Sequence, residues 1–392
     1  MKSKAFKGFL AISILLSAAW MVPHFAAAQE SGTVVPDTVE VVKARVIDIQ
    51  KEEEQVIPGT DTPGLFQTIE AEILEGSQKG KIVTFTDDYL HLQKGDIFYL
   101  NHTVQTMDGI ETYAEMDAYR MPTIYLFGGM FVLLVLLIGG MQGLRGLASL
   151  TGSLLLIFFV LIPGIIGGLS PVLVSVVVSA VIIIVGSYIT HGFNKTTSSA
   201  VVGMIITVLF TGALAYWAVH MGRLTGYGTD ESVYVTLNSR GKIDILGVLL
   251  GGMMIGFLGI LYDVAIGQAI SVEELHHIAP HVEKKRIYSR ALRIGREHIG
   301  ALVNTLAIAY VGASLPLLIV YAQSSTPISQ IANREVFATE IIRTFVGSIG
   351  LVLAVPITTF LAVMILVKRR GAADKEIIHE EREALKHYEH HH

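Results

Sequence analysis

Four polar residues mark the part of this sequence where chemistry could take place. Asp263 directly follows the apolar run 245–262, Arg296 precedes the run 299–321, and Asn304 and Tyr310 lie within it. Charged and polar side chains at membrane depth are costly and usually functional. We expect these four residues to line a path for a small solute or ion. Two alternatives stay open: Asp263 facing water at the interface, and Asn304 joining helices by hydrogen bonds.

A basic stretch leads into the same apolar run. On a helical wheel its arginines share one face, which Arg296 flanks, while Ala291 and Leu292 lie opposite. The residues expected to contact anionic lipid headgroups are Lys284, Lys285, Arg286, Arg290 and Arg293. In a sharper alternative, Arg296 pairs with Asp263 or contacts an anionic substrate.

Residue types argue against an enzyme. The chain has no cysteine, which excludes disulfides, thiolate metal sites and cysteine nucleophiles. His277 and His281 have the spacing of a helical zinc site, but Pro280 interrupts that face, so we expect no metal. The sequence has no P-loop, no GxSxG elbow and no HExxH motif. We therefore expect neither catalytic residues nor a cofactor.

Long apolar runs must position the polar residues. The length of each run is close to the roughly 20 residues that an α-helix needs to cross a bilayer. Segments that cross the hydrocarbon core in this way are expected to be helical, because their backbone groups must be hydrogen-bonded internally. The runs are 122–140, 147–168, 171–190, 199–220, 245–262, 299–321 and 341–367. Pro163, Pro316 and Pro356 are expected to kink three of these helices. Gly247 with Gly251, and Gly252 with Gly256, are expected to let another helix approach closely.

Charge gives the orientation of these spans. The chain is 52% hydrophobic and 16% charged. Its net charge of −5 argues against nucleic acid as a partner. With the segment before residue 121 outside, fourteen Lys and Arg lie in cytoplasmic segments and four in outer loops. This bias follows the positive-inside rule. We therefore expect a multi-pass protein of the cell (cytoplasmic) membrane with a cytoplasmic C-terminus.

The segment 29–120 has a different periodicity. Val42, Ala44 and Val46 alternate with charged residues, and the phase slips by one at residues 47–49. Five strands are expected, at 42–49, 66–74, 81–85, 96–101 and 110–116, with a charged turn at 51–54 and a hairpin turn at Asp108-Gly109. Five short strands fit a small extracytoplasmic β-barrel of OB type. Its aromatic residues are expected to fill or cover its core rather than bind a ligand.

The chain ends complete the domain organisation. Residues 1–28 resemble a signal peptide, with three lysines before an apolar core and Ala26-Ala27-Ala28 as the cleavage site. An uncleaved anchor is the alternative. The expected fold is thus mainly α-helical and polytopic, with about seven transmembrane helices after the β-domain 29–120. The membrane domain is 121–368 and the cytoplasmic tail is 369–392, whose terminal histidines support no inference.

Motifs in the second half resemble the YibE/F family of bacterial multi-pass membrane proteins. They are Tyr262-Asp263-Val264-Ala265, Glu274-Leu275, Gly295-Arg296-Glu297, Asn304-Thr305-Leu306, Ala309-Tyr310-Val311-Gly312 and Leu315-Pro316-Leu317. The similarity covers about 121–368. Here Gly267-Gln268-Ala269 stands where the family has small, often serine-rich residues. The resemblance implies an inner-membrane protein and names no substrate.

Two functional hypotheses follow. The first is a transporter or exporter of a small solute or ion, using Asp263, Arg296, Asn304 and Tyr310. The second is a non-transporting membrane scaffold or envelope sensor that acts through its β-domain. The expected partners are the lipid bilayer with its anionic headgroups, and either a second copy of the chain or an envelope protein.

Overall fold

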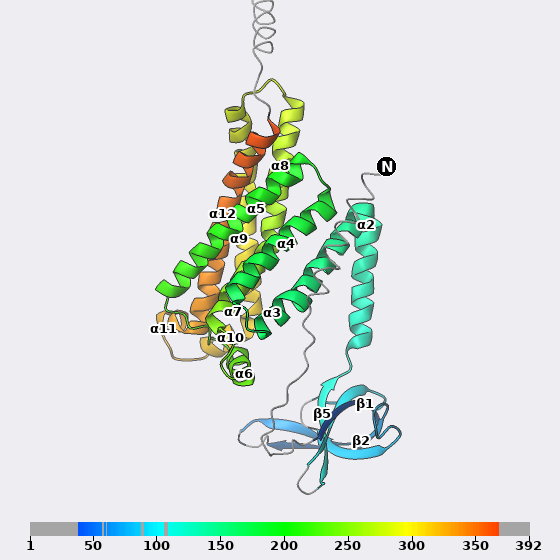
Figure 1. The fold of residues 1–392 in the computed structure, drawn as a ribbon. Coiled ribbons are helices and arrows are strands. Elements are labelled where there is room, and N and C mark those ends of the chain that lie inside the picture. Colours follow the sequence, from blue (N-terminus) through cyan, green and yellow to red (C-terminus); the bar gives the residue numbers. More distant parts are fainter. Residues whose placement is uncertain (1–37, 57–58, 60, 88–89, 106–108, 368–392) are drawn as a thin grey trace, which may run out of the picture. The chain divides into compact units, whose positions relative to one another are not determined.

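The computed structural model describes residues 38–56, 59, 61–87, 90–105 and 109–367. The predicted signal peptide and cytoplasmic tail lie outside these residues. The described chain divides into two compact units, 38–138 and 139–367, which we call the β-unit and the helical unit (Figure 1).

The β-unit contains the five predicted strands. They are β1 (Thr38–Val56), β2 (Pro63–Ile73), β3 (Ile82–Asp87), β4 (Ile97–Val104) and β5 (Glu111–Ala118). They form one antiparallel sheet in the order β3-β2-β1-β4-β5. The two edge strands approach each other through side chains, with Lys81 beside β3 paired to Glu111 of β5 at 2.8 Å. In the described residues no hydrogen-bonded ladder joins β3 to β5, so the sheet is a half-barrel.

Alternation along the strands builds the core of the half-barrel. Val42, Ala44 and Val46 are buried as predicted, and so are Ile69, Ala71 and Ile73 of β2. Phe98 is completely buried, and its ring packs against that of Phe85 at 5.6 Å between centroids. The period of two in the sequence therefore correctly identified the inward face of the sheet.

Strand β1 is longer than predicted. The charged stretch 51–54, which we expected to be a turn, continues the strand and pairs with Leu65–Thr68 of β2. The ladder hydrogen bonds, and a hydrogen bond from Gln67 to Glu52 of 3.2 Å, hold these charges in extended backbone. The phase slip predicted near Asp48 is confirmed as an irregularity between Val46 and Asp48. Asp108 of the predicted hairpin turn lies outside the described residues.

Helices make up the rest of the chain. They are α2 (Met121–Leu156), the π-helix η1 (Ile157–Leu161), α3 (Ile162–Ile166), α4 (Pro171–His191), α5 (Lys195–Met221), α6 (Asp230–Asn238), α7 (Ile245–Gly256), α8 (Leu258–Ile278), α9 (Lys284–Ala313), α10 (Leu315–Ala322), α11 (Ile328–Asn333) and α12 (Glu335–Leu366).

Five helical stretches are long and apolar enough to cross a membrane, or up to six if one bent pair forms a span. Our prediction of seven is therefore not confirmed. The difference arises at residues 121–166, where the first two predicted spans form one helical stretch. Gly140 interrupts this stretch with a backbone conformation (φ 53°, ψ −134°) that is not helical. Such dihedrals are accessible to glycine because it lacks a Cβ.

Two further breaks involve the predicted polar region. The fifth predicted span consists of α7 and α8, separated at Phe257. The sixth is the bent pair α9 and α10, whose axes differ by 66° at Ser314, two residues before Pro316. A proline cannot complete the helical hydrogen-bond pattern, which accounts for a break at this point. Pro356, in contrast, lies inside the continuous helix α12.

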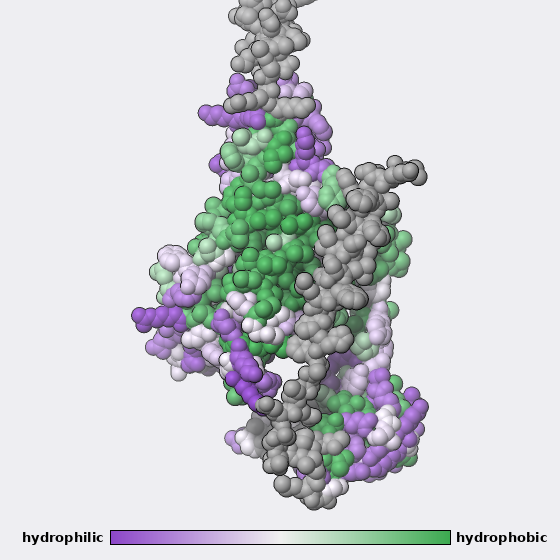
Figure 2. Space-filling view, in the orientation of Figure 1, coloured by the Kyte–Doolittle hydropathy of each residue, from purple (hydrophilic) through white to green (hydrophobic). Residues whose placement is uncertain are grey.

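Small residues let the helices of the helical unit approach closely. A Cβ on Gly203 of α5 would lie 3.1 Å from the backbone of Thr358 in α12. On Gly251 of α7 it would collide with Ser175 of α4, which confirms close packing at the first glycine pair. Of the second pair, Gly256 is approached by Tyr310 whereas Gly252 has open space. Figure 2 shows that the visible side of this unit is apolar, with hydrophilic residues gathered towards its ends.

Candidate functional site

Asp263 lies on α8, where this helix packs near the end of α4. Its carboxylate is within electrostatic range of His191, the last residue of α4. The ring of Tyr262 lies 5.9 Å from that of His191, and the Tyr262 hydroxyl donates a hydrogen bond to the Gly186 carbonyl at 3.3 Å. The structure therefore places His191 near Asp263, where one of the alternatives had placed Arg296.

Arg296 is exposed on α9, and the described residues contain no ion pair between it and Asp263. The inward position of this helix is the neighbouring Gly295, where a Cβ would lie 2.6 Å from the amide nitrogen of Gln268. The Gln268 side chain is buried on α8 and accepts a hydrogen bond of 2.8 Å from Thr359 of α12. A buried hydrogen bond thus joins α8 to α12 at the point where Gly295 of α9 packs against Gln268.

The side chains of Asn304 and Tyr310 have different surroundings. Asn304 is exposed on α9, and the structure shows no hydrogen bond to its side chain within the described part of the chain. Tyr310 is half-buried, with its ring 5.8 Å from the guanidinium of Arg343 on α12. Its hydroxyl would lie 3.1 Å from a Cβ on Gly256. Of the four predicted path residues, only Tyr310 therefore contacts a charged group inside the helical unit.

The expected lipid-contacting residues form an exposed basic face at the start of α9. Lys285, Arg286, Arg290 and Arg293 are exposed, and Lys284 is partly exposed. On the opposite side, Ile287 and Ala291 are buried in the core. The helix is therefore amphipathic here, as predicted. Among the described residues, His, Asp and Glu form no group of three or more that could hold a metal ion.

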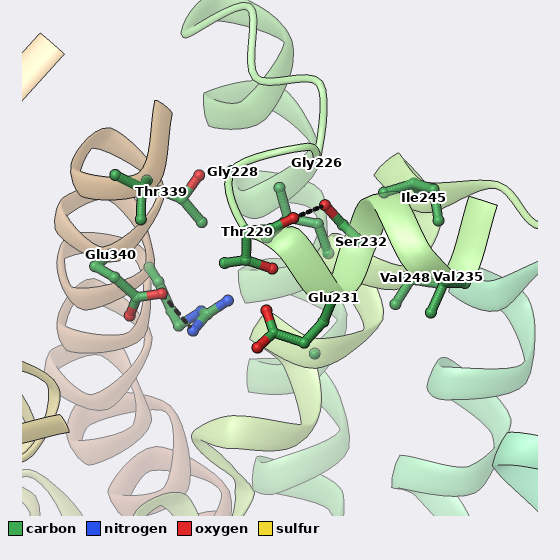
Figure 3. Close-up of a pocket in the computed structure, with 14 residues that line it drawn as sticks. Gly226, Gly228, Thr229, Glu231, Ser232, Val235, Ile245, Val248, Thr339 and Glu340 are labelled. Atoms are coloured by element: carbon green, nitrogen blue, oxygen red, sulfur yellow. Dashed lines mark hydrogen bonds and ion pairs between the residues drawn. The ribbon is translucent and has the colours of Figure 1, made fainter. Parts of the chain in front are cut away.

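A cavity of about 320 Å³ lies between α6, α7 and the beginning of α12 (Figure 3). Such a volume is at the small end of the range of ligand pockets. Its lining residues are Gly226, Gly228, Thr229, Glu231, Ser232, Val235, Ile245, Val248, Leu249, Gly252, Val336, Thr339, Glu340 and Arg343.

Three charged side chains line this cavity. Arg343 donates a hydrogen bond of 2.8 Å to Glu340 one turn earlier on α12, and both side chains are about three-quarters buried. Glu231 comes from the first turn of α6. Figure 3 shows its carboxylate directed across the cavity towards the Glu340–Arg343 pair. The backbone N–H of Glu231 and the Thr229 hydroxyl hold the pKa of Glu231 below its usual range, so this carboxylate is ionised at neutral pH.

The loop before α6 is fixed to α12 by one carboxylate. Glu335 accepts hydrogen bonds from the backbone N–H groups of Thr225 and Gly226, each at 2.7 Å, and from the Thr225 hydroxyl. Gly226 has a φ of 88° and leaves no room for a Cβ, which would lie 2.9 Å from the Ile245 carbonyl oxygen. This loop and helix α6 therefore form a defined wall of the cavity.

Sequence reasoning missed this site. It assigned no role to Glu231, Glu340 or Arg343. One signal was available, because Glu340 and Arg343 have the i, i+3 spacing of an ion pair on a helix that is otherwise apolar. Nothing in the sequence indicated that Glu231, more than a hundred residues earlier, would share their cavity.

Comparisons with known proteins identify a family. The model of YibE/F-like proteins matches residues 127–368, which include the whole helical unit and α2 from residue 127 onward. No curated protein and no solved structure matches the chain significantly. The matched segment makes up more than half of the chain and contains its apolar helices, which are consistent with a multi-pass membrane protein. The chain therefore belongs to the YibE/F-like family.

Proposed function

We propose that the protein is a membrane transporter or exporter of a small solute, and that the cavity between α6, α7 and α12 is its outer vestibule. The observation that carries this proposal is the Glu340–Arg343 pair on the cavity wall. Charged groups inside a membrane bundle are costly and commonly mark a substrate or ion pathway. We propose no catalytic activity for the site.

The proposed topology keeps seven spans. The non-helical residue Gly140 would separate the first two, residues 121–139 and 141–166, each of which is long enough to cross the bilayer. The five-stranded sheet of the β-unit is then extracytoplasmic and the C-terminus cytoplasmic, in the cell inner membrane. Reporter fusions after residue 118 and at the C-terminus test this: reporters on the same side would contradict the seven-span arrangement.

Within this topology, the cavity opens towards the outer solution and Tyr310 connects it to the middle of α9. Tyr310 contacts Arg343 through its ring and thereby links the predicted path to the cavity. Asp263, Arg296 and Asn304 would continue the path towards the cytoplasm. The basic face of α9 would bind anionic lipid headgroups at the cytoplasmic surface.

Flux into proteoliposomes tests the proposal. A panel of labelled amines, amino acids, sugars, organic anions and metal ions identifies a solute whose uptake requires the protein. We expect Arg343→Gln to reduce that uptake at least tenfold, because it leaves Glu340 unpaired beside the cavity. Lys242→Gln is the matched control, since it removes an exposed charge that does not line the cavity. Equal reduction by both variants, or none by either, would remove the cavity from the path.

The alternative function, a scaffold or envelope sensor, also rests on a specific observation. Val39, Val41 and Met116 leave apolar side chains about half exposed on the β-unit, where a partner could cover them. Deleting residues 30–118 distinguishes the two functions. A transporter should still carry the solute found in the flux assay, whereas a sensor that acts through the β-unit should lose its function while the helical unit still integrates.

A further inference from the structure

We propose that the cavity between α6, α7 and α12 binds a small organic cation, an amine that carries an apolar group. This inference deepens the proposed function by naming the class of solute, and its binding test does not depend on transport. It rests on the charges and the apolar walls of the cavity.

The charges of the lining residues favour a cation. Two carboxylates, Glu231 and Glu340, face one guanidinium, that of Arg343. Arg343 is already engaged, because it donates to Glu340 at 2.8 Å and lies against the ring of Tyr310. Glu231 has no such cationic partner among the described residues, and its carboxylate points into the cavity (Figure 3). The cavity thus keeps one uncompensated negative charge, which an ammonium group would neutralise.

The remaining walls fit an apolar group on the amine. Ile245, Val248 and Leu249 of α7 face the cavity on one side, and Val336 of α12 lines another part. Gly252 extends the apolar wall and leaves space, because a Cβ there would meet no atom within 4 Å. With about 320 Å³, the cavity accommodates a small amine with one aromatic or branched aliphatic group.

Calorimetric titration of the full-length protein in nanodiscs tests the proposal with probes of matched shape. They are 2-phenylethylammonium, the neutral 2-phenylethanol, the anionic phenylacetate and the zwitterion phenylalanine. We expect the ammonium probe to bind at least tenfold more tightly than the other three, because only it adds a positive charge without a negative one. Equal or tighter binding of any other probe, or failure of the ammonium probe to bind, would overturn the proposal.

Variants locate the binding site. Glu231→Gln should weaken binding of the ammonium probe about tenfold, whereas the neighbouring Asp230→Asn, which removes a charge outside the cavity, should leave it unchanged. Gly252→Val should abolish binding by filling the space. Unchanged binding in Glu231→Gln and Gly252→Val would overturn the proposed location.

Failure of this inference is distinguishable from failure of the proposed function. If the ammonium probe binds as expected but no labelled solute crosses the proteoliposome membrane, the site is confirmed and transport is refuted. If a solute of another class is carried while no ammonium probe binds, transport is supported and the cation site is refuted.

Discussion

The sheet of the β-unit carries pairs of opposite charges on its surface, whereas the helical unit exposes apolar side chains and buries hydroxyl groups. Lys43 with Glu75, and Lys81 with Glu111, pair on the β-unit around a core of valine, isoleucine and phenylalanine. In the helical unit, the buried Thr190, Thr207 and Thr211 hydroxyls donate to backbone carbonyls four residues earlier in their own helices. The surface of the sheet is thus suited to water, and the apolar surface of the helical unit is consistent with a membrane.

The largest expected effect tests the water-excluded core of the β-unit. Phe98→Ala should destabilise this unit by about 3–5 kcal/mol, because it removes a completely buried ring and leaves a cavity. Thermal unfolding followed by limited proteolysis of the β-unit measures the change. The partly exposed Val41→Ala is the control and should stay within about 0.5 kcal/mol of the wild type. Similar losses in both variants would contradict the burial pattern.

A charge on the outer surface of each unit tests the contrast directly. Leu209 is 53% exposed in the middle of α5, so Leu209→Lys should disfavour membrane integration by about 2.5–3.5 kcal/mol. Val41→Lys places the same charge on the exposed surface of the β-unit and should be neutral. The fraction of chain that resists alkaline extraction from membranes measures integration. Normal integration of Leu209→Lys would show that this surface does not face lipid.

Close helix packing predicts an intermediate effect. Gly203→Ala should destabilise the helical unit by about 1–3 kcal/mol, because the new methyl group would press on the backbone of Thr358. Gly300→Ala is the matched control, since a Cβ there meets no atom within 4 Å and alanine favours helix. Thermal stability in detergent compares the two. A stable Gly203→Ala protein would show that α5 and α12 separate easily.

The smallest expected effect concerns the edge of the half-barrel. Hydrogen bonds, first from Lys81 and then from Tyr113, lower the pKa of Glu111 from 4.5 to about 2. Because the folded pKa lies below the unfolded value, Glu111 stabilises the fold above about pH 4.5, and this contribution disappears as the pH falls towards 2. Glu111→Gln should therefore flatten the acid unfolding curve slightly. Glu54→Gln, on exposed β1, should leave the curve unchanged.

Much of the fold was predictable because it depends on local periodicity. The alternation at Val42, Ala44 and Val46 determined which face of β1 is buried. The apolar runs predicted the helices, although their number depends on the conformation of Gly140, which a sequence pattern cannot give. The candidate site was predicted only in part, since Tyr310 contacts Arg343, which lines the cavity, while Asn304 remains exposed.

By itself, the sequence determined the class of the protein, its family and its two kinds of surface, because hydrophobic patterns and motifs are read along one chain. The tertiary structure decided which polar groups meet. His191 lies beside Asp263, and Glu231 shares a cavity with Glu340, across 71 and 108 intervening residues. Such contacts depend on how helices pack, and the packing depends on glycines, breaks and loops whose geometry exists only in three dimensions.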